Sequence, residues 1–187
     1  MSGFWEYIER QINLVPQIVY GTLLLLFVIA SIVLLILHTK KATKSFAWLL
    51  FAEYLFIIYG ITVIFRDVNP NYSNYLTPFW NYKEIIYGED LSLLYEVIMN
   101  VVLFIPIGVL WGSQSKNKLK KQQWIVAFAL GLGLSIGIEV LQLVFKKGSF
   151  EIDDIIHNTL GCLIGFAAWR GCEKLVVAIK TGMEIIA

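Results

Sequence analysis

The sequence IVYGTLLLLFVIASIVLLIL, residues 18–37, is twenty residues long and contains no charged side chain. A helix of about 20 apolar residues is long enough to cross the hydrocarbon core of a bilayer. A cleavable signal peptide begins with basic residues and has a shorter apolar core, whereas the residues before this run include Glu6 and Glu9 with only Arg10 to balance them. We therefore expect the run to be retained as a membrane span.

The composition of the whole chain agrees with a membrane protein. Of 187 residues, 58% are hydrophobic and 16% are charged, and the mean hydropathy is +0.70, whereas soluble domains are nearer half apolar and a quarter charged. The net charge of +1 argues against a nucleic-acid-binding protein, which is usually strongly basic. The length suits a single domain, 1–187, with no room for a separate soluble enzyme domain. Cys162 and Cys172 would lie about 15 Å apart on a helix, which is too far for a disulfide, so we expect both to be buried free thiols.

Four more apolar segments follow the first, so we predict an all-α integral membrane bundle of about five transmembrane helices. The predicted spans are approximately 18–37, 46–65, 91–112, 124–145 and 150–169. Before the first span, apolar residues recur at helical spacing, which predicts an interfacial helix on the outer side, with a frayed terminus as the alternative. The segment 69–82 is rich in proline, asparagine and aromatic residues, and we expect it to fold back onto the outer face.

The distribution of basic residues predicts the orientation of these spans. Lys and Arg are enriched in short cytoplasmic loops. With the five spans above, ten of the fifteen basic residues lie on the side of the carboxyl terminus and five on the other side. We therefore predict an outer amino terminus and a cytoplasmic carboxyl terminus. Ten of the fourteen acidic residues lie on or near the outer side, and this asymmetry requires a functional or packing reason.

Polar side chains gather near the predicted outer ends of the later spans. Three pairs are spaced three or four residues apart and so share one helix face, and an arginine stands at the same depth. With Asp153, the neighbour of Asp154, the set consists of Arg66, Glu96, Asn100, Glu139, Gln142, Asp153, Asp154 and Asn158. One interpretation is that these groups only form hydrogen bonds and ion pairs with one another, with Arg66 paired to Glu139 or Asp154. Ionisable residues within a membrane usually mark a functional site, so we favour a cavity open to the outside that receives a polar head group.

Several kinds of chemistry suit such a cavity. Carboxylates and amides are ligands for Mg²⁺ or Ca²⁺, although no known metal-loop spacing is present, and the sequence identifies no cofactor. Paired carboxylates can act as general acid and base, and Arg66 can grip a phosphate or carboxylate. Nucleophilic catalysis is not favoured, because no serine lies beside a plausible base. We expect His157 to be an interface residue, and Glu53 to have a serine or backbone partner on a neighbouring helix.

Glycines predict where the helices pack most closely. Three pairs have the small-xxx-small spacing that permits close approach of membrane helices. They are Gly108 and Gly112, Gly133 and Gly137, and Gly161 and Gly165. The third, fourth and fifth spans, which carry the polar residues, are therefore expected to form a tightly packed core.

Several short motifs follow one another in a characteristic order between Arg66 and Gly165. They are Arg66, Pro78-Phe79, Asn100 with Phe104-Ile105-Pro106-Ile107-Gly108, Ser135 and Glu139 with Gln142, Gly148 through Asp154, and Asn158 through Gly161 with Gly165. This order resembles the VanZ-like family of small bacterial membrane proteins. The resemblance implies a cell-envelope role associated with resistance to the lipoglycopeptide teicoplanin. The chain departs from the family pattern at Glu151, where an aspartate is usual, at Lys147, near which an arginine is usual, and at Tyr75, where an asparagine is usual.

Three functional hypotheses follow. In the first, a non-enzymatic envelope protein in the bacterial cell membrane binds a lipid-linked or cell-wall-precursor head group and alters the access of lipoglycopeptides to the surface. In the second, the same carboxylates serve an integral-membrane hydrolase or transferase that acts on a phosphorylated or glycosylated lipid. The third, an ion-coupled carrier, is weakest because the polar residues do not continue to the cytoplasmic side.

Overall fold

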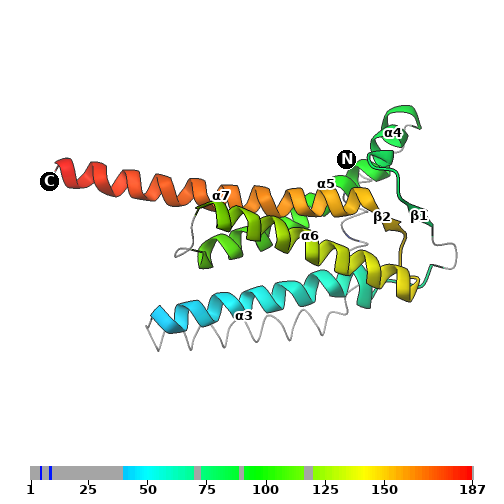
Figure 1. The fold of residues 1–187 in the computed structure, drawn as a ribbon, viewed down its shortest axis with the longest axis horizontal. Coiled ribbons are helices and arrows are strands. Elements are labelled where there is room, and N and C mark those ends of the chain that lie inside the picture. Colours follow the sequence, from blue (N-terminus) through cyan, green and yellow to red (C-terminus); the bar gives the residue numbers. More distant parts are fainter. Residues whose placement is uncertain are drawn as a thin grey trace.

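The structure is a computed structural model that describes Trp5, Glu9 and residues 40–69, 73–88, 91–115 and 120–186. The predicted first span, 18–37, lies outside the described residues, as does most of the predicted interfacial helix. In the described part, long helices run along the longest axis of the molecule (Figure 1). The elements are α3 (Lys40–Tyr59), η1 (Gly60–Ile64), β1 (Asn74–Tyr75), α4 (Trp80–Tyr87), α5 (Leu91–Gln114), α6 (Lys120–Phe145), β2 (Phe150–Glu151) and α7 (Ile152–Ile186). The predicted all-α class is confirmed.

Three helical segments are long and apolar enough to cross a membrane: Ser45–Ile64, Ser92–Gln114 and Lys121–Phe145. They correspond to the predicted second, third and fourth spans. The predicted fifth span, 150–169, falls on β2 and the first half of α7, which is not one of these three. The first two turns of α7 hold Asp153, Asp154, His157 and Asn158, and these polar residues lower its mean hydropathy.

Helices α5 and α7 pack backbone against backbone. A Cβ atom built on Gly165 would lie 1.9 Å from the carbonyl oxygen of Ile105, and one built on Gly108 would lie 1.9 Å from the carbonyl oxygen of Cys162. Only a residue without a side chain fits at such a distance, so the close packing predicted for these glycines is confirmed.

The glycine prediction is wrong for one position in α6. A Cβ atom on Gly133 would meet nothing within 4 Å, and one on Gly137 would meet the hydroxyl of Tyr59 at 2.9 Å rather than α7. The glycine of α6 that faces α7 is Gly131, where a Cβ atom would lie 2.8 Å from the Cβ of Cys162. Residues two positions apart do not share a helix face, so Gly131 and Gly133 point in different directions.

A short parallel pairing joins two loops at one end of the bundle. Asn74 pairs with Phe150 and Tyr75 with Glu151, which makes β1 and β2 a two-stranded sheet. The backbone N–H of Asn69 also donates to the carbonyl of Lys146, at 2.6 Å. The aromatic segment therefore folds back onto the bundle, beside the start of α7, and leads into α4.

The apolar core lies further along the bundle. Its largest group of buried side chains includes Ile58, Phe104, Ile107, Ile138 and Cys162. Cys162 and Cys172 are both free thiols, as predicted. Cys162 is buried as expected, whereas Cys172 is exposed, so the expectation that both are buried is wrong for Cys172. The buried apolar side chains thus fill the middle of the bundle, and the polar residues gather at the end that carries β1 and β2.

Candidate functional site

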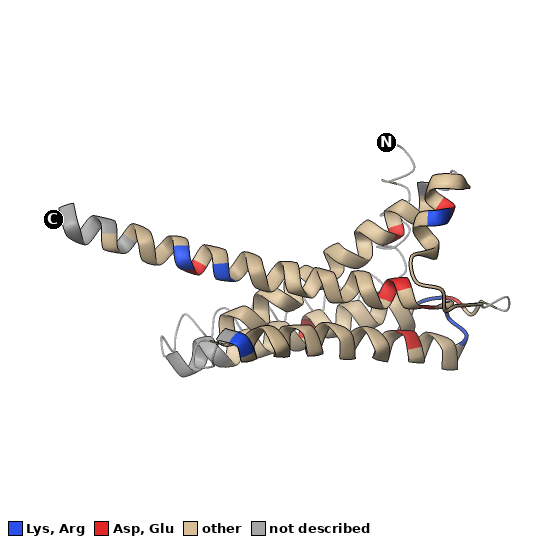
Figure 2. Cartoon of the chain, turned by 45° about the horizontal axis from the view of Figure 1, so that its top comes forward, with Lys and Arg blue, Asp and Glu red and all other residues tan. Residues whose placement is uncertain are grey.

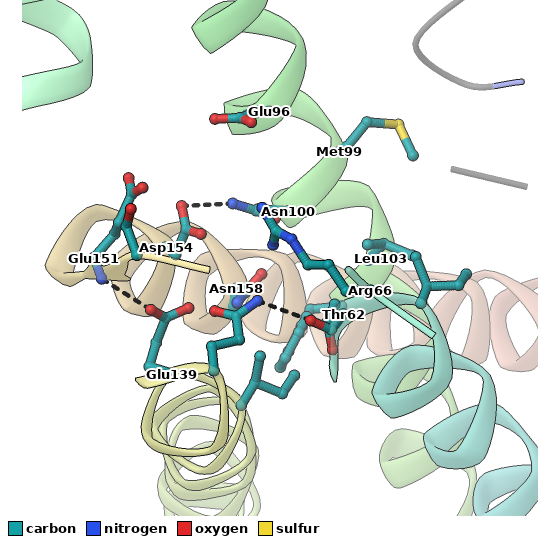
Figure 3. Close-up of a pocket in the computed structure, with 15 residues that line it drawn as sticks. Thr62, Arg66, Glu96, Met99, Asn100, Leu103, Glu139, Glu151, Asp154 and Asn158 are labelled. Atoms are coloured by element: carbon teal, nitrogen blue, oxygen red, sulfur yellow. Dashed lines mark hydrogen bonds between the residues drawn. The ribbon is translucent and has the colours of Figure 1, made fainter. Parts of the chain in front are cut away.

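A cavity of about 300 Å³ lies where η1, α5, α6, β2 and α7 meet. Seven of the eight predicted site residues line it, and Figure 3 shows six of them with labels. The seven are Arg66, Glu96, Asn100, Glu139, Gln142, Asp154 and Asn158. The one-turn spacing within each helix thus carries both members of each pair to the same space. Their role in binding a ligand stays a prediction.

An irregular helix end brings the arginine to the cavity. The segment Gly60–Ile64 is a π-helix, and the N–H of Phe65 donates to the carbonyl of Gly60 at 2.9 Å. A π-turn is wider than an α-turn and is often found at functional sites. Thr62 and Arg66, in and just after this turn, both line the cavity. No sequence pattern indicates the π-turn, and Thr62 was not predicted as a site residue.

The cavity has an apolar wall as well as a polar one. The apolar wall is formed by side chains from η1, α5 and α6. These are Ile61, Met99, Leu103, Phe104 and Ile138. Such a mixture of apolar lining and a few polar groups is typical of sites that bind small molecules.

Hydrogen bonds hold the polar side chains across element boundaries. The Nδ2 of Asn100 donates to Oδ1 of Asp154 at 2.7 Å, and the backbone N–H of Glu151 donates to Oε2 of Glu139 at 2.8 Å (Figure 3). The Nε2 of Gln142 donates to the carbonyl of Thr62 at 3.1 Å. These bonds connect α5 with α7, β2 with α6, and α6 with η1.

Arg66 is not ion-paired with the carboxylates of the cavity. Across the described ranges, the salt bridge within 4.0 Å is the one between Arg170 and Glu173, far along α7. The guanidinium of Arg66 lies instead against Gly148, where a Cβ atom would be 3.3 Å from Nη1. The alternative prediction, that Arg66 pairs with Glu139 or Asp154, is therefore wrong for the described residues.

Glu151 also lines the cavity, although it was not predicted as a site residue. It lies in β2, outside the membrane-spanning helices. Burial, together with the carboxylates of Asp154 and Glu96, raises the pKa of Glu151 from 4.5 to about 8, and Arg66 opposes part of this rise. Its place in the motif Gly148 through Asp154 is the signal that would have identified it.

The structure corrects the placement of Asp153, which does not line the cavity. Its Oδ1 accepts a hydrogen bond from the N–H of Phe79 at 2.5 Å, and its Oδ2 accepts one from the N–H of Asn81 at 3.0 Å. Phe79 has a positive φ of 64° and precedes the first residue of α4. Asp153 therefore caps the amino terminus of α4. Neighbouring residues on a helix face different directions, so Asp153 and Asp154 cannot both face the cavity.

Predictions were also made for His157 and Glu53, and their outcomes differ. His157 is buried and its Nε2 hydrogen-bonds with the hydroxyl of Tyr82 at 2.9 Å, so it is the interface residue that was predicted. Glu53 was expected to have a serine or backbone partner. Its buried Oε1 has no hydrogen-bond partner among the residues that the structure describes, so that expectation is not met there.

Metal binding through the carboxylates finds no support in their geometry. Within the described part of the chain, no group of three or more His, Cys, Asp or Glu side chains is arranged to hold a metal ion. The cavity offers an arginine, several carboxyl groups and amides.

Comparison with known proteins agrees with the motif pattern. The family described as VanZ/LLP1 matches residues 23–176. Protein VanZ of Enterococcus faecium is 37% identical over 91 residues, a match that covers 49% of this chain and 54% of that protein. The chain thus spans about half the length of this curated relative. No solved structure matches. With three helices able to cross a membrane and a family match over most of its length, the chain belongs to the VanZ/LLP1 family of membrane proteins.

Proposed function

We propose that this protein acts in the bacterial cell envelope, where it contributes to lipoglycopeptide resistance of the teicoplanin type by binding the head group of a lipid-linked molecule such as a cell-wall precursor. The observation that carries the proposal is the cavity, in which seven predicted polar residues from four parts of the chain meet beside an apolar wall. Family membership and the similarity to Protein VanZ support the link to resistance.

The size and lining of the cavity favour a lipid head group over a whole antibiotic. A volume of about 300 Å³ is at the lower end for small-molecule sites. A head group fits this space, and the apolar wall suits the first carbons of its lipid chain. Binding such a molecule changes what is accessible to a lipoglycopeptide at the membrane surface.

The proposed orientation puts the cavity on the outer side of the membrane. Ten of the fifteen basic residues lie on the side of the carboxyl terminus by sequence. Figure 2 shows basic residues along the far part of α7, and both acidic and basic residues toward the end of the bundle that carries the short strands. Basic residues on the carboxyl-terminal side favour a cytoplasmic location for that side. An outward-facing cavity is accessible to lipid intermediates on the outer leaflet.

A second candidate function is an integral-membrane hydrolase or transferase acting on a phosphorylated or glycosylated lipid. The observation that favours it is the raised pKa of Glu151, about 8, beside Glu139 in the same cavity. A carboxyl group that keeps its proton near neutral pH can act as a general acid. Turnover of an undecaprenyl-type phospholipid by the purified protein, abolished by Glu151→Gln, would support this function.

The proposed function is tested with substitutions in the cavity. Glu139→Gln and Asp154→Asn remove ionisable groups with little change in shape, and Glu173→Gln on the far part of α7 is the matched control. In a teicoplanin-susceptible host, both cavity variants are expected to lower the inhibitory concentration to that of the empty vector, whereas the control keeps the wild-type value. Protein abundance in the membrane is measured in parallel. Full resistance in both cavity variants at normal abundance would reject the proposal.

A further inference from the structure

The cavity has more hydrogen-bond acceptors than donors. Four carboxyl groups line it and a single arginine is the one described basic residue among its lining side chains. Among the residues that the structure describes, two buried acceptor atoms in the cavity wall have no hydrogen-bond partner: Oδ1 of Asn158 and Oε2 of Glu151. Asn158 is only 4% exposed. An unpaired buried acceptor is unfavourable, so this wall is suited to a ligand that brings N–H or O–H donors.

The arginine provides the opposite kind of contact. Within the described ranges, no carboxylate lies within 4.0 Å of the guanidinium of Arg66. A guanidinium offers a planar set of N–H donors that matches a phosphate or a carboxylate. The Arg66 end of the cavity is therefore suited to an anion, while the wall of Asp154, Asn158 and Glu151 is suited to a cation or donor group.

We propose that the head group bound in this cavity is zwitterionic, with an anionic group on Arg66 and a protonated primary amine on Glu151 and Asp154. This inference rests on the proposed function and specifies its ligand class. Amine-bearing phosphate esters, such as an aminoethyl phosphate, have this combination of groups.

Other charge types match the cavity less well. An anionic head group without an amine uses Arg66 but brings no positive charge to Glu151, whose carboxyl holds its proton in the empty cavity and ionises beside a cation. A simple cation satisfies the carboxyl groups but leaves Arg66 without an anion. A neutral sugar neutralises neither the carboxyl groups nor Arg66. The surplus of acceptors together with the unpaired guanidinium thus favours a ligand that carries both charges.

Binding of short-chain lipids to the purified full-length protein in a neutral detergent tests the inference. Calorimetry would compare dihexanoyl phosphatidylethanolamine, which has a primary amine, with dihexanoyl phosphatidylglycerol, which has none, and with dihexanoyl phosphatidylcholine, whose quaternary ammonium has no N–H. We expect phosphatidylethanolamine to bind about tenfold more tightly than either, the value of one charge-assisted hydrogen bond.

Three variants assign the contacts. Glu151→Gln is expected to abolish the preference for the amine-bearing lipid. Arg66→Gln is expected to weaken the binding of phosphatidylethanolamine and phosphatidylglycerol alike, and Glu173→Gln to leave the binding of both unchanged. Each variant is used only if it elutes as a monodisperse species, and Asp154→Asn replaces Glu151→Gln if the latter does not.

The outcomes separate this inference from the proposed function. If phosphatidylglycerol binds as tightly as phosphatidylethanolamine or more tightly, and its binding still depends on Arg66, the inference of a zwitterionic head group is wrong. The proposal that the cavity binds a head group would still stand. Absence of any lipid binding that depends on the cavity residues overturns both. Soluble phosphoethanolamine, measured in parallel, distinguishes the source of the ligand. If it binds as tightly as the lipid, the result supports a zwitterionic ligand and contradicts the view that this ligand is part of a lipid.

Discussion

Two adjacent aspartates at the start of α7 have different roles. Asp154 lines the cavity and accepts a hydrogen bond from Asn100, whereas Asp153 is fully buried and accepts hydrogen bonds from the backbone at the start of α4. The angle between successive residues on a helix directs one carboxylate to each side. One short polar sequence thus builds the site and also fixes the neighbouring helix α4.

Replacement of Asp153 is expected to loosen α4 without emptying the cavity of its polar groups. Asp153→Ala leaves two backbone N–H groups without their acceptor, which is expected to lower the free energy of unfolding by about 1–3 kcal/mol. Hydrogen exchange measured by mass spectrometry should show faster exchange in residues 80–87. Asp154→Asn is the control and should leave exchange in α4 unchanged; equal effects of the two variants would contradict the separate roles.

Glu151 is expected to make stability depend on pH. Its pKa in the folded protein is about 8, raised from 4.5 by burial and then by Asp154 and Glu96, with Asp153 adding to the rise and Arg66 opposing it. The folded carboxyl therefore keeps its proton over a range in which the unfolded one has lost it. Its contribution to stability is full below pH 4.5 and is lost as the pH rises to about 8.

The variant Glu151→Gln cannot ionise, so it should remove this part of the pH dependence. Melting temperatures of wild type and variant in detergent, measured from about pH 4.5 to pH 8.5, should diverge in slope, with the wild type falling more steeply. Parallel curves would show that Glu151 does not hold its proton as described.

At the scale of the elements, glycines determine how α5 and α7 meet. Gly161 adds to the contact, since a Cβ atom there would lie 2.1 Å from the carbonyl oxygen of Val101. Backbones this close leave no space for a side chain and hold the two helices in one register. The residues Asn100 on α5 and Asp154 on α7 are brought within hydrogen-bonding distance by the same packing.

A methyl group in this contact should separate the helices. Gly165→Ala would place its Cβ 1.9 Å from a backbone oxygen of Ile105, so we expect destabilisation of about 1–3 kcal/mol or more, measured as a lower unfolding midpoint in detergent. Gly133→Ala is the matched control, because a Cβ atom there meets nothing within 4 Å, and it should change stability by less than about 1 kcal/mol. Similar losses for both variants would refute this packing.

At the scale of the whole molecule, α7 is the longest described helix. Its 35 residues correspond to about 52 Å at 1.5 Å per residue, more than the roughly 30 Å of the hydrocarbon core. If the cavity end is outside, residue 172, twenty positions after the start of α7, reaches the opposite boundary. The exposed thiol of Cys172 is therefore a natural reporter of orientation.

Labelling of intact cells with a membrane-impermeant maleimide tests this orientation. Leu76→Cys, at a position 60% exposed beside β1, combined with Cys172→Ala, should be labelled in intact cells. Cys172 in the wild type should be labelled only after lysis, and Cys162 is buried and should stay unreactive. The reverse pattern would put the cavity in the cytoplasm.

Local sequence patterns predicted much of this arrangement. Length and hydropathy were enough for three spans, and one-turn spacing brought Glu139 with Gln142 and Asp154 with Asn158 to one cavity, because helix geometry is local. The π-turn at Gly60–Ile64, the pairing of β1 with β2 and the choice of Gly131 over Gly133 depend on contacts between distant segments. Such contacts have no periodic signature, so the place of Thr62 in the cavity and the lack of an Arg66 ion pair within the described residues could not be anticipated.

The backbone contact between α5 and α7 also bears on the entropy of binding. Because Asn100 and Asp154 lie on helices that cannot slide past one another, the acidic wall is preorganised before a ligand arrives. Preorganised groups lose little conformational freedom on binding, so more of the interaction energy appears as affinity. The side chain of Arg66 is exposed overall, although it rests against Gly148, so it still has conformational freedom to lose when a ligand binds.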